Sequence, residues 1–123
     1  MSISTIPLSS PIGSTLAVDT QSDVTAESIK TSSATAFLID CDNTLNDDSS
    51  FTKLYNVNVS PTVGTTVPAH IIRSLPNVRL TVTIGQGEGG VLGTGIFMAT
   101  VTTGGTGGVT SPTSNVTAKL LYT

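Results

Sequence analysis

Few side chains in this sequence could carry out chemistry. The 123 residues include one His, one Cys and eight acidic residues, whereas a catalyst needs several nucleophilic or titratable groups that converge on one point. His70 precedes Ile71 and Ile72 on an expected strand, and no G-x-S-x-G sequence supplies a nucleophile for it. We therefore expect no enzyme activity and predict no catalytic residue.

The one motif that suggests a metal is the acidic run at 40–48. Residues 40–44 (DCDNT) begin like a calcium loop, because alternate side-chain oxygens along a tight turn can surround a hard cation. A helical calcium loop needs Gly and a distal Glu where this chain has Leu45 and Phe51, so an EF-hand is excluded. An irregular surface calcium site stays open beside the simpler interpretation of Asx turns. Its candidate ligands are Asp42, Asp47 and Asp48. No other metal and no cofactor is expected.

Cys41 has no partner for an intrachain disulfide, because it is the only Cys of the chain. It lies between Asp40 and Asp42, without the basic neighbour that lowers the pKa of a reactive thiol. We interpret it as a small apolar residue at the end of a strand.

A glycine-rich segment formally matches a nucleotide-binding motif. Residues 85–90 (GQGEGG) follow an expected strand, as the dinucleotide fingerprint G-x-G-x-x-G requires. No helix is expected to begin at 92–95, and no acidic residue follows Glu88 to hold a ribose. We predict a loop or β-bulge here, with no bound nucleotide.

The charge of the chain argues against nucleic acid as a partner. The net charge is −3, whereas a nucleic-acid surface needs clustered Lys and Arg. The basic residues are scattered: Lys30, Lys53, Arg73, Arg79 and Lys119. No membrane partner is expected either, because no apolar run is long enough to cross a bilayer. Residues 1–13 lack the basic start and continuous apolar stretch of an export signal, so we expect a protein made and used without Sec-type export.

Most of the chain consists of short, Thr- and Val-rich segments that alternate in the manner of β-strands. At 78–84 the apolar residues face one way and Arg or Thr the other, and 51–59 is expected to be a half-buried strand of the same kind. A helix at 22–30 is conceivable because Asp23 could cap it, but the β-branched residues there favour a strand at 28–31. The expected strands are 28–31, 35–41, 51–59, 69–75, 78–84, 96–102 and 115–122.

About seven to eight short strands separated by turns predict an all-β fold, an antiparallel, jelly-roll-like β-sandwich over residues 25–123. Residues 1–24 mix Ser, Thr and Pro with isolated apolar residues, a pattern that predicts an extended N-terminal arm able to dock on a neighbour. The partner-binding candidates of this arm are Ile6, Leu8, Ile12, Leu16 and Val18.

Residues 51–108 and 115–123 resemble a β-sandwich domain of tailed-bacteriophage virion proteins. Four short segments carry the resemblance: Lys53-Leu54-Tyr55-Asn56, the PTVGTT sequence at 61–66 before Pro68, the glycine-bounded Gly95-Ile96, and the closing Leu120-Leu121-Tyr122. The motif identifies a virion-type domain more sharply than it identifies the part of the virion.

This resemblance implies a small structural subunit on the virion, such as a capsid cement or decoration protein that stabilises capsomer junctions. The implied partners are the major capsid protein and further copies of the chain, in a homotrimer. The implied location is the capsid surface, after synthesis in the host cytoplasm.

An alternative is a head or tail fibre element with a receptor-binding or glycan-binding role. Such a module would use the loops at 43–50 or 85–95. Sugar sites usually present aromatic platforms, however, and the chain has no Trp.

Overall fold

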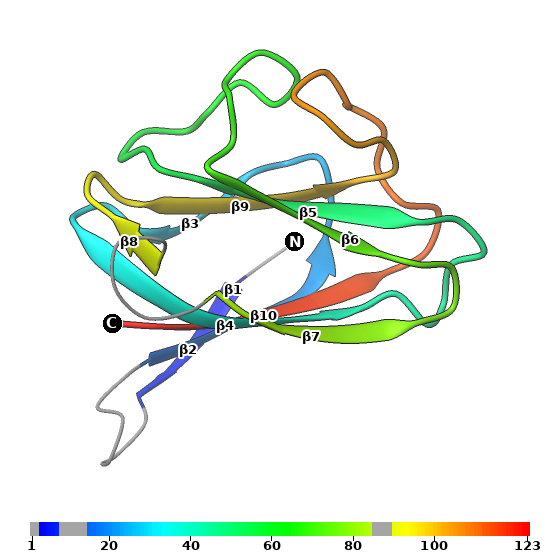
Figure 1. The fold of residues 1–123 in the computed structure, drawn as a ribbon, viewed down its shortest axis with the longest axis horizontal. Coiled ribbons are helices and arrows are strands. Elements are labelled where there is room, and N and C mark those ends of the chain that lie inside the picture. The colour runs from blue at the N-terminus through cyan, green and yellow to red at the C-terminus, as the bar shows by residue number, and fades with distance from the viewer. Residues whose placement is uncertain (1–2, 8–14, 85–89) are drawn as a thin grey trace.

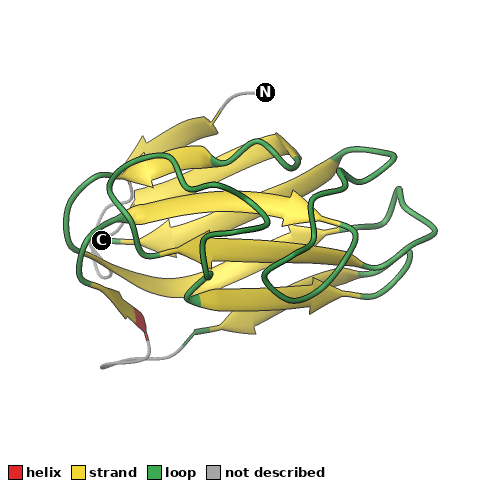
Figure 2. Ribbon diagram, turned by 90° about the horizontal axis from the view of Figure 1, so that it is seen from above, coloured by secondary structure: helices red, strands yellow, loops and turns green. Residues whose placement is uncertain are grey.

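The computed structural model describes residues 3–7, 15–84 and 90–123. Within these ranges the chain forms ten β-strands in two antiparallel sheets that face each other as a sandwich (Figure 1). Strands and their connecting loops make up nearly all of the described chain (Figure 2). The antiparallel β-sandwich expected from the sequence is therefore confirmed.

The larger sheet has six strands in the order β1-β2-β10-β4-β7, with β8 paired to β4. Its strands are β1 (Ile3–Pro7), β2 (Thr15–Ser22), β10 (Val116–Tyr122), β4 (Ala34–Asp42), β7 (Arg79–Thr83) and β8 (Val91–Leu92). The smaller sheet has four strands in the order β3-β9-β5-β6. They are β3 (Glu27–Lys30), β9 (Ile96–Val101), β5 (Ser50–Tyr55) and β6 (His70–Ser74).

The core lies between the sheets and follows from the alternation of side chains along each strand. In β10 every second residue is buried, because successive side chains of a strand point to opposite faces. The inner face of the larger sheet contributes Ala17, Ala36, Ile39, Ala118 and Leu120 to the core, and that of the smaller sheet contributes Leu54, Ile72, Ile96 and Met98. The core is therefore built from aliphatic residues of modest size.

Strand β7 confirms the alternation expected at 78–84 from Leu80 onward, whereas Val78 lies before the strand and is exposed. Leu80 and Val82 pack against the core, whereas Thr81 and Thr83 are exposed. The loop expected at 85–95 is only partly testable, since 85–89 lies outside the described residues. Beyond it, Val91 and Leu92 form the short strand β8 against Ala34 and Thr35.

Strand β5 differs from the half-buried strand expected at 51–59. The strand ends at Tyr55, and the side chains of Lys53 and Tyr55, on its outer face, are fully buried. The loop after β9 covers this face: Lys53 Nζ donates to the carbonyl oxygens of Thr106 (3.3 Å) and Gly108 (3.2 Å). Figure 1 shows this loop and the one between β5 and β6 above the smaller sheet. The expectation that one face of this strand would be exposed to solvent was wrong, because both loops fold back onto the sheet.

The N-terminal region also differs from the expected arm over 1–24. Residues 15–22 are extended, but as strand β2 they lie between β1 and β10. Ala17 and Asp19 of this strand face the interior and are fully buried. This segment has too few apolar residues to fold alone, but β10 supplies partners for its backbone N–H and C=O groups. The following turn is not helical: Asp23 Oδ1 accepts from Thr25 N (2.8 Å), and β3 begins at Glu27.

Candidate functional site

Two features of the structure could bind a partner or ligand: an apolar row on the outer face of the larger sheet and a polar pocket at one end of the sandwich. The row is set by strand register. Ile6 of β1 lies opposite Leu16 of β2, and Leu16 lies opposite Leu121 of β10. Leu121 in turn lies opposite Leu38 of β4. Residues directly opposite in an antiparallel pair project to the same face. We call Ile6, Leu16, Leu121 and Leu38 the outer row.

The outer row points away from the core. The chain neighbours Ala17, Leu120 and Ile39 are fully buried on the inner face, so the alternation of each strand directs the row outward. Ile6 is 48% exposed, and the three leucines are only partly buried. Four large aliphatic side chains thus cross four adjacent strands with part of their surface in solvent.

The outer row contains two of the five partner-binding candidates, Ile6 and Leu16. Val18 lies on the same face one pair further along β2, opposite Ser4 and Lys119. Leu8 and Ile12 lie outside the described residues. Sequence reasoning missed Leu38 and Leu121, because only strand pairing brings them next to the N-terminal strands.

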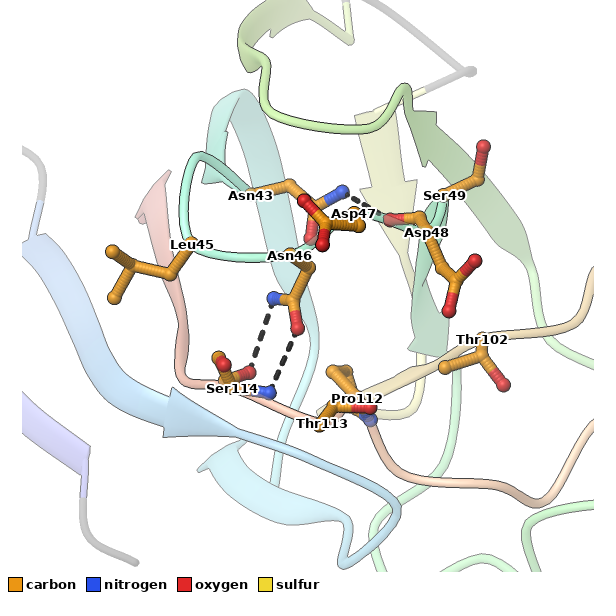
Figure 3. Close-up of a pocket in the computed structure, with 10 residues that line it drawn as sticks. All are labelled: Asn43, Leu45, Asn46, Asp47, Asp48, Ser49, Thr102, Pro112, Thr113 and Ser114. Atoms are coloured by element: carbon orange, nitrogen blue, oxygen red, sulfur yellow. Dashed lines mark hydrogen bonds between the residues drawn. The ribbon is translucent and has the colours of Figure 1, made fainter.

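The pocket lies between the β4–β5 loop and the segment that precedes β10 (Figure 3). Its volume is about 150 Å³. The side chains that line it are those of Asn43, Leu45, Asn46, Asp47, Asp48, Ser49, Thr102, Pro112, Thr113 and Ser114.

Asn46 joins the two walls of the pocket. Its Oδ1 accepts from Ser114 N (2.7 Å) and its Nδ2 donates to Ser114 O (3.1 Å), as the dashed lines in Figure 3 show. The Asn46 carbonyl also accepts from Asn77 N (2.9 Å). A side-chain amide that satisfies a backbone N–H and C=O in this way holds the two segments at a fixed separation.

Asn43 is fully buried in the wall of the pocket. Its Nδ2 donates to the carbonyl oxygens of Asp48 (2.9 Å) and Leu75 (3.0 Å). Its Oδ1 is buried and has no hydrogen-bond partner among the described residues. The side chain therefore shapes the loop with its donor and leaves an acceptor unused.

The structure brings together two of the three calcium candidates. Asp47 and Asp48 line the pocket with exposed side chains. Asp42 does not line it: its Oδ1 accepts from the hydroxyl (2.6 Å) and the N–H (3.1 Å) of Thr44, and these bonds lower the pKa of Asp42. In the described part of the chain, no three His, Cys, Asp or Glu side chains form a metal-binding group. Any cation here would need Asn43 as well, a residue that the acidic pattern did not single out.

In comparisons with known proteins, no family model, curated protein or solved structure matches the chain. Among the described residues, no helix has the length and apolar character needed to cross a bilayer.

Proposed function

We propose that the chain is a structural virion protein of a tailed bacteriophage, and that it binds the capsid as a cement or decoration protein. The class of protein comes from the sequence resemblance, and the outer row supports a binding role. Apolar side chains that line up on an outer sheet face are a common feature of protein interaction surfaces. Loops of the chain cover Lys53 and Tyr55 on the outer face of the smaller sheet. We therefore assign the partner to the outer face of the larger sheet.

The proposed mechanism is mechanical. Many copies lie across the junctions between capsomers, with the outer row of each against the major capsid protein. Each contact is weak, and the symmetry of the particle sums the contacts into resistance against the pressure of packaged DNA. Association of the copies into trimers belongs to the same proposal.

Replacement of Ile6 by Gln tests the docking face. Ile6 lies on the edge strand β1 and is 48% exposed, so the substitution should leave the fold intact. Burial of such a side chain at an interface contributes about 1.5–3 kcal/mol. We therefore expect Ile6→Gln to weaken binding to particles that lack the protein by roughly tenfold or more. Co-sedimentation of purified protein with such particles measures this affinity.

Val59→Gln is the matched control, because Val59 is 70% exposed and lies in the loop between β5 and β6, outside the outer row. We expect it to bind particles as the unmodified protein does. Equal binding by Ile6→Gln and the unmodified protein would remove the outer row from the proposed interface.

A further inference from the structure

The pocket at the end of the sandwich concentrates negative charge and hydrogen-bond acceptors. Two carboxylates, those of Asp47 and Asp48, line it. None of its ten lining residues is a Lys, Arg or His. A ligand that enters this pocket therefore meets two negative charges and no lining side chain that would neutralise them.

The buried amide of Asn43 adds an acceptor to this set. Its donor is already used by two backbone carbonyls, whereas its Oδ1 has no partner among the described residues. A buried acceptor without a partner costs free energy unless something binds to it. Figure 3 shows Asn43, Asp47 and Asp48 on the same loop, with Thr113 and Ser114 on the opposite wall.

We propose that this pocket binds Ca²⁺ through the carboxylates of Asp47 and Asp48 and the Oδ1 of Asn43. Carboxylate and amide oxygens are the ligands that Ca²⁺ prefers, and its flexible coordination suits an irregular loop, with waters in the remaining positions. Mg²⁺ demands a near-ideal octahedron, and no thiolate or imidazole lines the pocket to favour Zn²⁺.

A bound Ca²⁺ would hold the β4–β5 loop in the conformation that Asn46 already fixes against Ser114. The two carboxylates on this loop would then share one cation. The expected consequence is a more stable sandwich in calcium. This inference is independent of the outer row, which lies on strands β1, β2, β10 and β4 and not in these loops.

The test uses the full chain freed of metal with a chelator. Isothermal titration with CaCl₂ should give saturable binding with a Kd of about 0.1–1 mM, typical of sites with few carboxylates. Excess calcium should raise the thermal unfolding midpoint by several degrees, since a ligand of the folded state stabilises it. Mg²⁺ at the same concentration should bind at least roughly tenfold more weakly.

The variants Asp47→Asn and Asp48→Asn should each weaken Ca²⁺ binding by roughly tenfold or more, because each removes one ligand charge. Asp42→Asn is the matched control: it lies on the same loop, outside the pocket, and Asn keeps the acceptor that Thr44 uses. Its affinity should stay within about twofold of the unmodified chain. Failure of the unmodified chain to bind Ca²⁺ saturably would overturn the proposal. So would equal loss of affinity in all three variants, or no loss in Asp47→Asn and Asp48→Asn.

Discussion

Asp19 is the residue with the most unusual environment in the fold. It faces the interior from β2 and is fully buried. Its Oδ1 accepts from Gln21 N (3.0 Å), but its Oδ2 has no partner among the described residues. Burial raises the pKa of Asp19 from 3.8 to about 6, and the negative charges of Glu27 and Asp23 add to this effect. The folded chain therefore favours the neutral, protonated acid.

This shift predicts that the contribution of Asp19 to stability is largest in acid. Between about pH 4 and about pH 6 the folded state holds a proton on Asp19 that the unfolded state has lost, so the free energy of unfolding falls as pH rises through this window. The loss is about 3 kcal/mol in total. Above about pH 6 the contribution of Asp19 is constant.

Asp19→Asn should remove this dependence, because the amide is neutral at all these pH values and still accepts from Gln21 N. We expect the variant to unfold at higher denaturant concentration than the unmodified chain at neutral pH, with little difference near pH 4. Asp48→Asn is the control: it removes a carboxylate that is exposed outside the core and is not among the charges that act on Asp19. Urea titrations across the pH range measure the effect. A variant no more stable than the parent at neutral pH would contradict the account of Asp19.

The residues that carry the resemblance to virion proteins have structural roles. Tyr55, Leu120 and Tyr122 are buried in the two apolar clusters, and Lys53 anchors the loop after β9. A Cβ on Gly95 would lie 2.5 Å from the Val57 carbonyl oxygen, so only glycine fits there. These residues therefore serve the fold, whereas Leu121 of the same closing segment belongs to the outer row.

At the scale of elements, the sequence predicts those strands in which apolar and polar residues alternate along the whole strand. Strands β7 and β10 are of this kind: in β7 partly buried and exposed residues alternate, and in β10 every second residue is buried. Strand β2 was not predicted, because Ala17 is the one apolar residue among its buried positions, beside the polar Asp19 and Ser22. Its place in the sheet depends on pairing with β10, almost a hundred residues away, which no local pattern encodes. The pocket shows the same dependence on distant contacts. The sequence predicts Asp47 and Asp48 as ligand candidates, but not Asn43. The Asn43 side chain is oriented by hydrogen bonds from its Nδ2 to the carbonyl oxygens of Ser74, in β6, and Leu75, just after it.

The position of β2 predicts how far the N-terminus can be shortened. Removal of residues 1–7 takes away the edge strand β1, in which Ile3 packs against the core and residues 4–6 are exposed, and should leave a cooperative fold. Removal of residues 1–20 also takes most of β2, with Ala17 and the backbone partners of β10, and should unfold the domain or lower its stability by several kcal/mol. Circular dichroism with thermal melts distinguishes the two. A native-like melt of the longer truncation would show that β2 belongs to a detachable arm, as the sequence alone suggested.

At the scale of the whole molecule, the outer faces of the two sheets differ in how far the chain's own loops cover them. The chain covers the smaller sheet with its own loops, which bury Lys53 and Tyr55. The larger sheet carries the outer row, in which two residues from the N-terminal strands meet two from β4 and β10. On the smaller sheet Ile71 stays exposed beside the covered Lys53. The larger sheet differs because it aligns aliphatic side chains from four strands, which suits it to lie flat on a partner.

Cryo-electron microscopy of the tailed-phage particles to which we propose this chain belongs tests the central claim most directly. Our account predicts density for the sandwich at the junctions between capsomers, with the outer row of the larger sheet against the capsid shell. Density confined to the tail or a fibre would contradict the cement role and favour attachment to a receptor. Absence of the chain from the particles would contradict the virion function as a whole.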